Sequence, residues 1–238
     1  MKKAFKILLL TFMILGMVSS LAIASPTYEF TNSDPNVNSE LNRGNAANYA
    51  VQWAKKPGNS AYASYGSGTL GGDCTNFVSQ VLKGGGMYFH GTRGSNIFTQ
   101  DWYYYGPNVP PATNPRTSTW TGAHEFRKHW GTVGGTGGKK AYEMVTYTNL
   151  EAVDYFDSIY NQLWKGDIIQ FSDGNGLTGH SIAIWNYGTP SGVNTMNYAQ
   201  HSTDGGVWDW ALDLRAKLTS IKYTSGYVHT LKMKNGTY

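Results

Sequence analysis

The sequence predicts an α+β fold in which N-terminal helices pack on a C-terminal antiparallel sheet. Apolar residues recur at helical spacing from Leu41 to Lys56, and again in the segment that follows Cys74. Short apolar and aromatic runs separated by Gly, Pro, Asn or Asp turns fill the C-terminal part. Helices followed by strands, without regular alternation, are typical of an α+β domain.

The N-terminus has the pattern of an export signal. Lysines at positions 2, 3 and 6 precede a nearly continuous apolar stretch from Leu8 to Ala24, which ends in the small-x-small sequence Ala22-Ile23-Ala24. An uncleaved membrane anchor is the alternative, but a stretch of about 17 residues is at the short limit for crossing a bilayer. We therefore expect cleavage after Ala24.

This reading divides the chain into a signal (1–24), a polar, flexible leader (25–40) and a single domain (41–238). No later stretch is long and apolar enough to span a membrane, so no stable membrane insertion is expected once the signal is removed. The protein is then secreted and extracellular, or associated with the cell wall. Three of the 19 basic residues leave with the signal, against 15 acidic residues in the whole chain. The remaining charge is nearly balanced, which gives no reason to expect a nucleic-acid partner.

Two main helices are expected before the sheet. The first spans Leu41 to Lys56 and ends at Pro57-Gly58. The second begins at Asp73, a good N-cap residue, and ends at Gly84-Gly85-Gly86. Cys74 therefore lies in the first turn of a helix whose apolar face is buried.

Four strands and two further helical segments are expected later in the chain. The helical segments are Thr121 to Trp130 and Asn149 to Leu163. The strands are Asp167 to Phe171, His180 to Trp185, Thr195 to Ser202 and Tyr227 to Met233.

Cys74 is the only cysteine, so no intramolecular disulfide is possible. A helix start lowers the pKa of a thiol, because the unpaired amides of the first turn favour a negative charge. The same amides stabilise the oxyanion that forms when a sulfur attacks a carbonyl group. Cys74 is therefore a candidate nucleophile, and a buried structural thiol is the alternative.

A thiol nucleophile needs a base, and His180 is the best placed of the six histidines. It begins a predicted strand and shares a face with Ile182 and Ile184, which we expect to point toward the cysteine helix. Either His201 or Asn197, both on one face of the next strand, is expected to orient His180.

The segment Gly71-Gly72-Asp73-Cys74-Thr75-Asn76-Phe77-Val78-Ser79-Gln80 resembles the signature of the putative amidase domain family of Gram-positive bacteria. Further matches follow in the expected order: Asn48 to Ala54, Trp120 to Ala123, Lys165 to Ile169, Gly179-His180-Ser181 and His201 to Asp204. That family is similar to the NlpC-type and CHAP cell-wall hydrolases. The resemblance covers the chain from about Leu41 to the C-terminus; the loop before the cysteine departs from the family's Asn-Pro-x-Tyr turn.

The resemblance implies a papain-like cysteine hydrolase fold with Cys74 as nucleophile, His180 as base and His201 as the third residue. It implies an amidase or peptidase that hydrolyses amide bonds in peptidoglycan or peptides. No zinc-binding pattern is present, so no metal or other cofactor is expected, and we expect a monomer. A non-catalytic wall-binding surface protein and a thiol acyltransferase are the alternatives.

Overall fold

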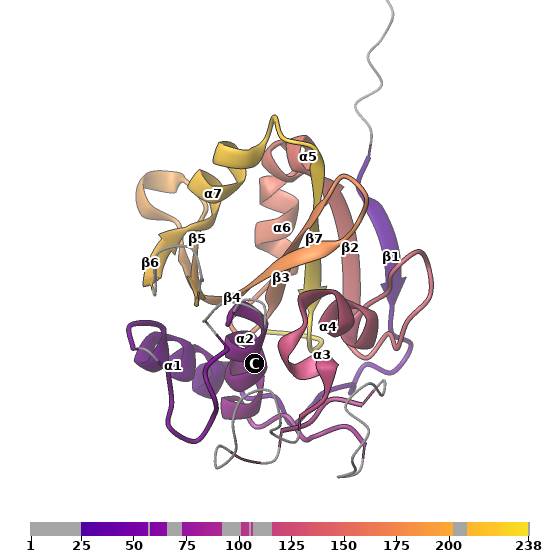
Figure 1. Cartoon of the computed structure of the whole chain (residues 1–238). Coiled ribbons are helices and arrows are strands. Elements are labelled where there is room, and N and C mark those ends of the chain that lie inside the picture. Colours follow the sequence, from indigo (N-terminus) through magenta and orange to yellow (C-terminus); the bar gives the residue numbers. More distant parts are fainter. Residues whose placement is uncertain are drawn as a thin grey trace, which may run out of the picture.

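The computed structural model describes residues 25–56, 58–65, 73–91, 101–104, 106, 116–201 and 209–237. The predicted signal, 1–24, and the glycines that precede Asp73 lie outside these ranges. Within them, a seven-stranded antiparallel sheet carries helices on both faces (Figure 1). The predicted α+β class is therefore confirmed.

The sheet joins strands that are distant in sequence. Its spatial order is β1-β2-β7-β3-β4-β5-β6, and each neighbouring pair is antiparallel. The strands are β1 (Thr27–Thr31), β2 (Glu143–Thr148), β3 (Ile168–Asp173), β4 (Thr178–Gly188), β5 (Thr195–Gln200), β6 (Asp209–Asp213) and β7 (Gly226–Lys232).

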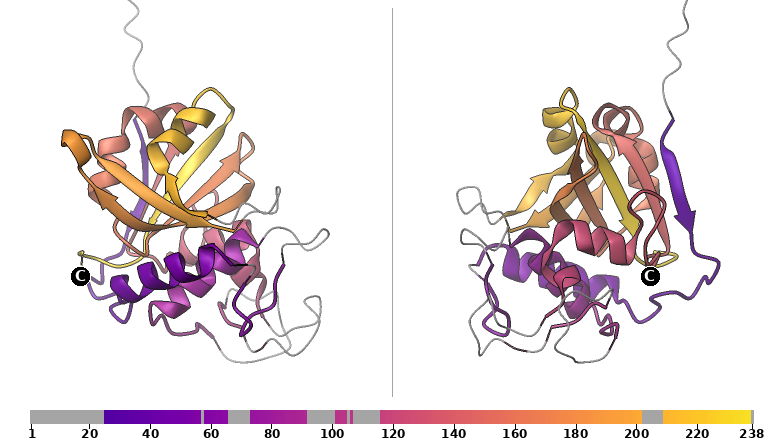
Figure 2. Two further views of the ribbon diagram at one scale, coloured as in Figure 1. Left: turned by 90° about the vertical axis from the view of Figure 1, so that its left-hand side faces the viewer. Right: turned by 45° about the vertical axis from the view of Figure 1, so that its right-hand side comes forward.

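Helices that precede β2 in the sequence cover one face of the sheet, and later helices cover the other (Figure 2). The first group comprises α1 (Arg43–Ala54), α2 (Cys74–Gly84), α3 (Ser118–Thr121) and α4 (Ala123–Trp130). The second comprises α5 (Asn149–Asp154), α6 (Phe156–Gln162) and α7 (Leu214–Ile221). A short 3₁₀ turn (Pro190–Gly192) links β4 to β5.

Each face of the sheet has its own hydrophobic core, because successive strand residues point to opposite sides. In β3, Ile168 packs with α1, α2 and α4, whereas Ile169 packs with α5, α6 and α7. The α2 side also holds a cluster of large aromatic side chains that includes Trp102, Trp120 and Trp130.

Most of the predicted elements are present with small shifts at their ends. The two main helices appear as α1 and α2, and the four predicted strands appear as β3, β4, β5 and β7. The helical segment 149–163 forms α5 and α6. The sequence analysis did not identify β1, β2, β6 or α7.

The expectation of a flexible leader over residues 25–40 is wrong. Residues Thr27–Thr31 form β1, which pairs with β2 at the edge of the sheet, and Phe30 packs against the α2-side core. Farther along, Asn38 donates hydrogen bonds to the carbonyl oxygens of Lys140 and Met233. The polar composition of this segment concealed a strand that is stabilised by pairing with a distant partner.

The predicted orientation of β4 is also wrong. Ile182 and Ile184 pack with α5, α6 and α7, while Ala183 and Ser181 face α2. The centre of β4 is a continuous apolar run without alternating polar residues, so its sequence does not show which of its side chains face α2. This choice matters for the partner of His180.

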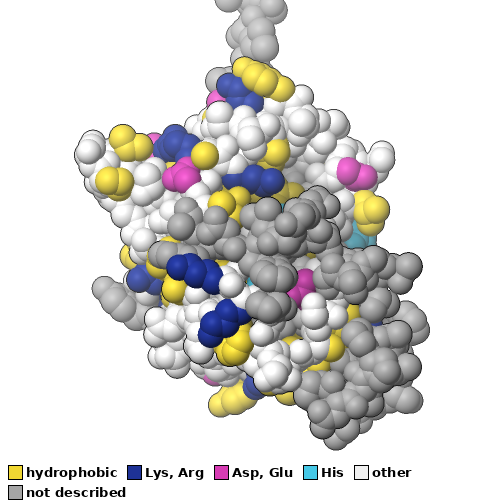
Figure 3. Space-filling model, turned by 60° about the vertical axis from the view of Figure 1, so that its left-hand side comes forward, with side chains coloured by type: hydrophobic (Ala, Val, Ile, Leu, Met, Phe, Trp, Pro, Cys, Tyr) yellow, Lys and Arg dark blue, Asp and Glu magenta, His cyan; other side chains and the backbone are white. Residues whose placement is uncertain are grey.

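Surface charge is sparse and mixed. On the face shown in Figure 3, basic and acidic side chains are interspersed among many neutral ones, without a broad basic patch over the coloured part. None of the helices in the described ranges combines the length and apolar character needed to cross a lipid bilayer.

Candidate active site

Cys74 is the first residue of α2, and its side chain is only 5% exposed. The neighbouring Thr75 hydroxyl forms a 3.0 Å hydrogen bond with the Ser181 hydroxyl, which attaches the first turn of α2 to β4. The backbone amide of Ser181 also donates to the sulfur of Cys74. These contacts hold the thiol against the strand that carries His180.

His180 lies between the sulfur and an amide side chain. It is hydrogen bonded to Cys74, and its Nε2 atom lies 2.7 Å from Oε1 of Gln200, at the end of β5. Because Nε2 is engaged by Gln200, Nδ1 is the ring nitrogen available to the sulfur. The imidazole also stacks on Phe171, its cross-strand partner, with ring centroids 6.1 Å apart.

The surroundings of Cys74 favour the thiolate. Burial of the sulfur is the largest single influence and opposes its ionisation, but it is opposed in turn by the hydrogen bond and the positive charge of His180. Hydrogen bonds from Thr75 and from the Ser181 amide add to the effect, so the pKa of the thiol is lowered from its ordinary value.

The surroundings of His180 favour the imidazolium in the same way. Burial again opposes the charged form, but the hydrogen bond and negative charge of Cys74, followed by the hydrogen bond to Gln200, raise the pKa of His180. Lys217 of α7 acts in the opposite direction. Both shifts favour a negative sulfur beside a positive imidazole, which is the arrangement that a cysteine nucleophile needs.

The structure brings two of the three sequence-predicted residues together. His201 bonds elsewhere: its Nδ1 lies 2.7 Å from Oδ2 of Asp73, and its Nε2 lies 3.0 Å from the carbonyl oxygen of Trp53. Asn197 pairs with Asp213 of β6 and accepts a long hydrogen bond from Asn186. The acceptor on His180 is therefore Gln200, rather than His201 or Asn197.

The identity of this acceptor follows from the orientation of β4. His180 shares the face of Ile182, which points toward α7, so a partner on β5 must come from the face of Met196 and Tyr198. Gln200 is the next residue on that face. The alternation along β5 was available in the sequence, but the side of the sheet was not.

The expected N-cap role of Asp73 is corrected as well. Asp73 occupies the N-cap position, but its carboxylate makes no capping hydrogen bond to α2. Instead it accepts hydrogen bonds from the Tyr65 amide, the Asn76 side chain and His201. Its role is to connect the segment before α2, the helix itself and the end of β5.

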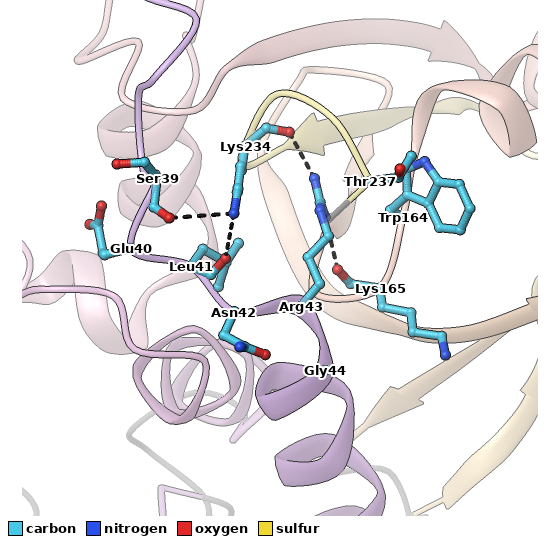
Figure 4. A pocket seen from close by; sticks show the side chains of 10 residues that line it. All are labelled: Ser39, Glu40, Leu41, Asn42, Arg43, Gly44, Trp164, Lys165, Lys234 and Thr237. Carbon is cyan, nitrogen blue, oxygen red and sulfur yellow. Dashed lines mark hydrogen bonds between the residues drawn. The ribbon is translucent and has the colours of Figure 1, made fainter.

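A hollow of about 540 Å³ lies at the N-terminal end of α1, whereas the Trp53 carbonyl is at the C-terminal end (Figure 4). Within it, Lys234 Nζ donates to the carbonyl oxygens of Ser39 and Leu41. Arg43 donates to two carbonyl oxygens and forms a buried ion pair with Asp167. These contacts attach α1 to β3 and to the C-terminal segment, so we assign them a structural role.

No cluster of His, Cys, Asp or Glu in the parts of the chain that the structure describes is arranged to hold a metal ion.

Comparison with known proteins identifies the family of the chain. Residues 40–226 match the family model described as a putative amidase domain. No curated protein and no solved structure showed significant similarity to the chain. The matched range contains Cys74, His180 and Gln200, and it covers most of the sequence. The chain therefore belongs to the putative amidase domain family, whose activity is the hydrolysis of amide bonds.

Proposed function

We propose that the protein is a secreted cysteine amidase or peptidase that hydrolyses amide bonds in peptidoglycan. Cys74 is the nucleophile, His180 transfers the proton, and Gln200 holds the His180 ring in position. The observation that carries the proposal is the hydrogen-bonded series from Cys74 through His180 to Gln200, with both pKa shifts toward the charged pair.

In the first half-reaction, the Cys74 thiolate attacks the amide carbonyl carbon and forms a C–S bond. The carbonyl oxygen becomes an oxyanion, which the amides of the first turn of α2 stabilise. The C–N bond then breaks as the His180 imidazolium gives its proton to the leaving amine. The products are a free amine, a Cys74 thioester and a neutral imidazole.

In the second half-reaction, the neutral imidazole takes a proton from water, and the resulting hydroxide attacks the thioester. The C–S bond breaks to release a carboxylic acid and the Cys74 thiolate, and His180 is again an imidazolium. Gln200 accepts a hydrogen bond from Nε2 throughout, so the ring keeps Nδ1 toward the sulfur.

The sequence supports both the substrate and the location of the enzyme. The resemblance of the Cys74 segment to wall-directed amidases supports peptidoglycan as substrate. The signal-like sequence 1–24 supports export to the compartment where peptidoglycan lies. The bonds open to such an enzyme include the link from muramic acid to L-alanine, stem-peptide bonds and bridge bonds.

The test is incubation of the protein beginning at Ser25 with purified peptidoglycan in ¹⁸O-labelled water, followed by mass spectrometry of the fragments. We expect soluble fragments with one ¹⁸O in each new carboxyl group. Cys74→Ala and His180→Ala should each remove nearly all activity, and the double variant should be little worse than either. His90→Ala, a histidine outside the site, serves as the control and should retain activity.

Other outcomes point to the alternatives. Release of amine without ¹⁸O incorporation, with the acyl group joined to an added amine, would identify an acyltransferase. Sedimentation with peptidoglycan, without cleavage in any variant, would identify a wall-binding protein. Full activity of His180→Ala would exclude the cysteine–histidine mechanism.

A further inference from the structure

Asp73, which directly precedes the proposed nucleophile, is buried and only 4% exposed. Its Oδ1 accepts hydrogen bonds from the Tyr65 amide at 3.0 Å and from Asn76 Nδ2 at 2.7 Å, and its Oδ2 bonds His201. An ionised carboxylate one residue from a thiolate destabilises it, because like charges repel strongly where water is excluded. An activated Cys74 therefore requires that the charge of Asp73 be balanced.

His201 provides this balance through both ring nitrogens. Nδ1 lies 2.7 Å from the Asp73 carboxylate, and Nε2 lies 3.0 Å from the Trp53 carbonyl oxygen. Both partners are oxygen acceptors, so each ring nitrogen is placed to donate a hydrogen bond, which is the arrangement that suits a doubly protonated imidazole.

The position of His201 is fixed on every side. The ring stacks on Phe77 of α2 at 4.2 Å between centroids, with 23° between the planes, and is only 1% exposed. Its two hydrogen bonds reach the end of α1 and the residue that precedes α2. A ring held in this way has little freedom to move away from Asp73.

We propose that His201 is a positioning residue for the cysteine: it neutralises Asp73 and thereby keeps Cys74 in the thiolate form. The inference rests on Cys74 being the nucleophile of the proposed function. His201 and Gln200 are consecutive at the end of β5 and face opposite sides, so one serves Cys74 through Asp73 and the other serves His180.

The other titratable groups near the pair are accounted for. Tyr49 of α1 is a neutral phenol, because burial raises its pKa and the charge of Asp73 adds to that effect. His180 faces the Cys74 sulfur from β4, and Lys217 of α7 acts on His180. In the part of the chain with assigned structure, His201 is the basic side chain paired with Asp73.

The test is the pH dependence of Cys74 alkylation by iodoacetamide, which reports the thiolate directly and needs no substrate. His201→Gln can still donate to Asp73 but cannot carry a charge. We expect its labelling profile to shift to higher pH, with labelling about tenfold slower near pH 7. Adding Asp73→Asn to His201→Gln removes the uncompensated charge and should restore the original profile.

His129→Gln is the matched control, because His129 is another buried histidine that bonds a side chain, His90, away from the cysteine. Its labelling profile should not change. An unshifted profile for His201→Gln, or a double variant no faster than His201→Gln, would overturn the proposal. Asp73→Asn alone should label at least as fast as the parent, so slower labelling there also contradicts it, even if His201→Gln fails to fold.

The two proposals fail in different ways. If Cys74→Ala leaves amide hydrolysis intact, the proposed function is wrong while the labelling profiles still report the thiol. If the labelling profiles do not depend on His201 but Cys74→Ala is inactive, the function stands and this inference does not.

Discussion

Gln200 places the imidazole of His180 through one hydrogen bond of 2.7 Å. Gln200→Ala removes the acceptor and frees the ring to rotate. We expect kcat to fall about 10- to 100-fold, less than the loss for His180→Ala, because an orienting residue does not itself move the proton. Steady-state kinetics on a defined amide substrate measures this loss.

Two further variants separate orientation from a general loss of stability. Gln200→Glu keeps an acceptor at the same reach and should recover most of the rate. Asn197→Ala, on the other face of β5, should be nearly silent. A severe loss in Asn197→Ala, with normal activity in Gln200→Ala, would show that the acceptor on His180 has been misassigned.

Lys217 lies over an aromatic ring that is part of the surroundings of His180. Its Nζ lies 5.6 Å from the centroid of Phe171, which stacks on His180, and its charge opposes the imidazolium. Replacing Lys217 with Ala should therefore raise the pKa of His180. The alkaline limb of kcat/KM reports loss of the imidazolium proton, so it should move to higher pH.

Lys222→Ala is the control for this shift, because Lys222 also lies over an aromatic ring, that of Tyr223, at 4.5 Å. Its pH profile should coincide with that of the parent. A shift of the Lys217→Ala limb to lower pH would contradict the assigned sign of the interaction.

At the level of secondary structure, the strongest sequence patterns predicted helices and strands that are present in the structure. α1 and α2 have apolar residues at helical spacing, and β3, β4, β5 and β7 are apolar runs bounded by turn residues. β1 lacked such a signal because it is short and lies at a sheet edge, where pairing with β2 rather than composition stabilises it. α7 is short and has few buried residues, chiefly Leu214 and Leu218.

The parts of the candidate site that depend only on neighbouring residues in the sequence were predictable. The position of Cys74 at a helix start follows from adjacent residues, and His180 follows from the start of a strand. The choice among Asn197, Gln200 and His201 depends on which side of the sheet β4 faces. That is a property of tertiary packing, because both sides of β4 are covered by helices.

The start of α5 is stabilised by a capping box on Thr148. The Thr148 hydroxyl accepts a 3.2 Å hydrogen bond from the Glu151 amide, and the Glu151 carboxylate accepts a 2.7 Å hydrogen bond from the Thr148 amide. Thr148→Ala should lower the free energy of unfolding by about 1 kcal/mol. Urea denaturation measures the change, and exposed Thr219→Ala is the control; equal losses in the two would contradict a capping role.

For the whole molecule, His229 predicts a loss of stability in acid. Burial, followed by the charges of Arg127 and His124, lowers the pKa of His229 from 6.5 to about 3. The unfolded chain therefore binds a proton that the folded protein rejects, between these two values. This contribution to stability is present above about pH 6.5 and is lost as the pH falls toward 3.

Between pH 7 and pH 4 the loss from His229 should be about 3 kcal/mol. Denaturant midpoints measured across this range test it, with His229→Gln expected to have the flatter dependence. Burial also lowers the pKa of His90, but by less, so His90→Gln should flatten the dependence less than His229→Gln does. An equally steep acid loss in His229→Gln would assign the effect to other groups.

Export of the whole chain is a separate prediction. If the signal ends at Ala24, N-terminal sequencing of protein from culture medium should begin at Ser25 or close to it. Membrane-bound protein that retains Met1 would contradict this. Cleavage there leaves β1, which begins at Thr27, intact at the edge of the sheet.

The adjacency of Gln200 and His201 makes the length of β5 critical. Neighbouring strand residues point to opposite sides of the sheet. Deleting one residue within β5 would therefore turn Gln200 and His201 to the wrong sides, and neither His180 nor Cys74 would keep the contact that it depends on. The loop from Thr189 to Asn194 precedes the strand and carries no such restriction, since changes of length there leave the pairing of β4 with β5 in place. Changes of length should therefore be tolerated in this loop but not within β5, although the two segments are only a few residues apart.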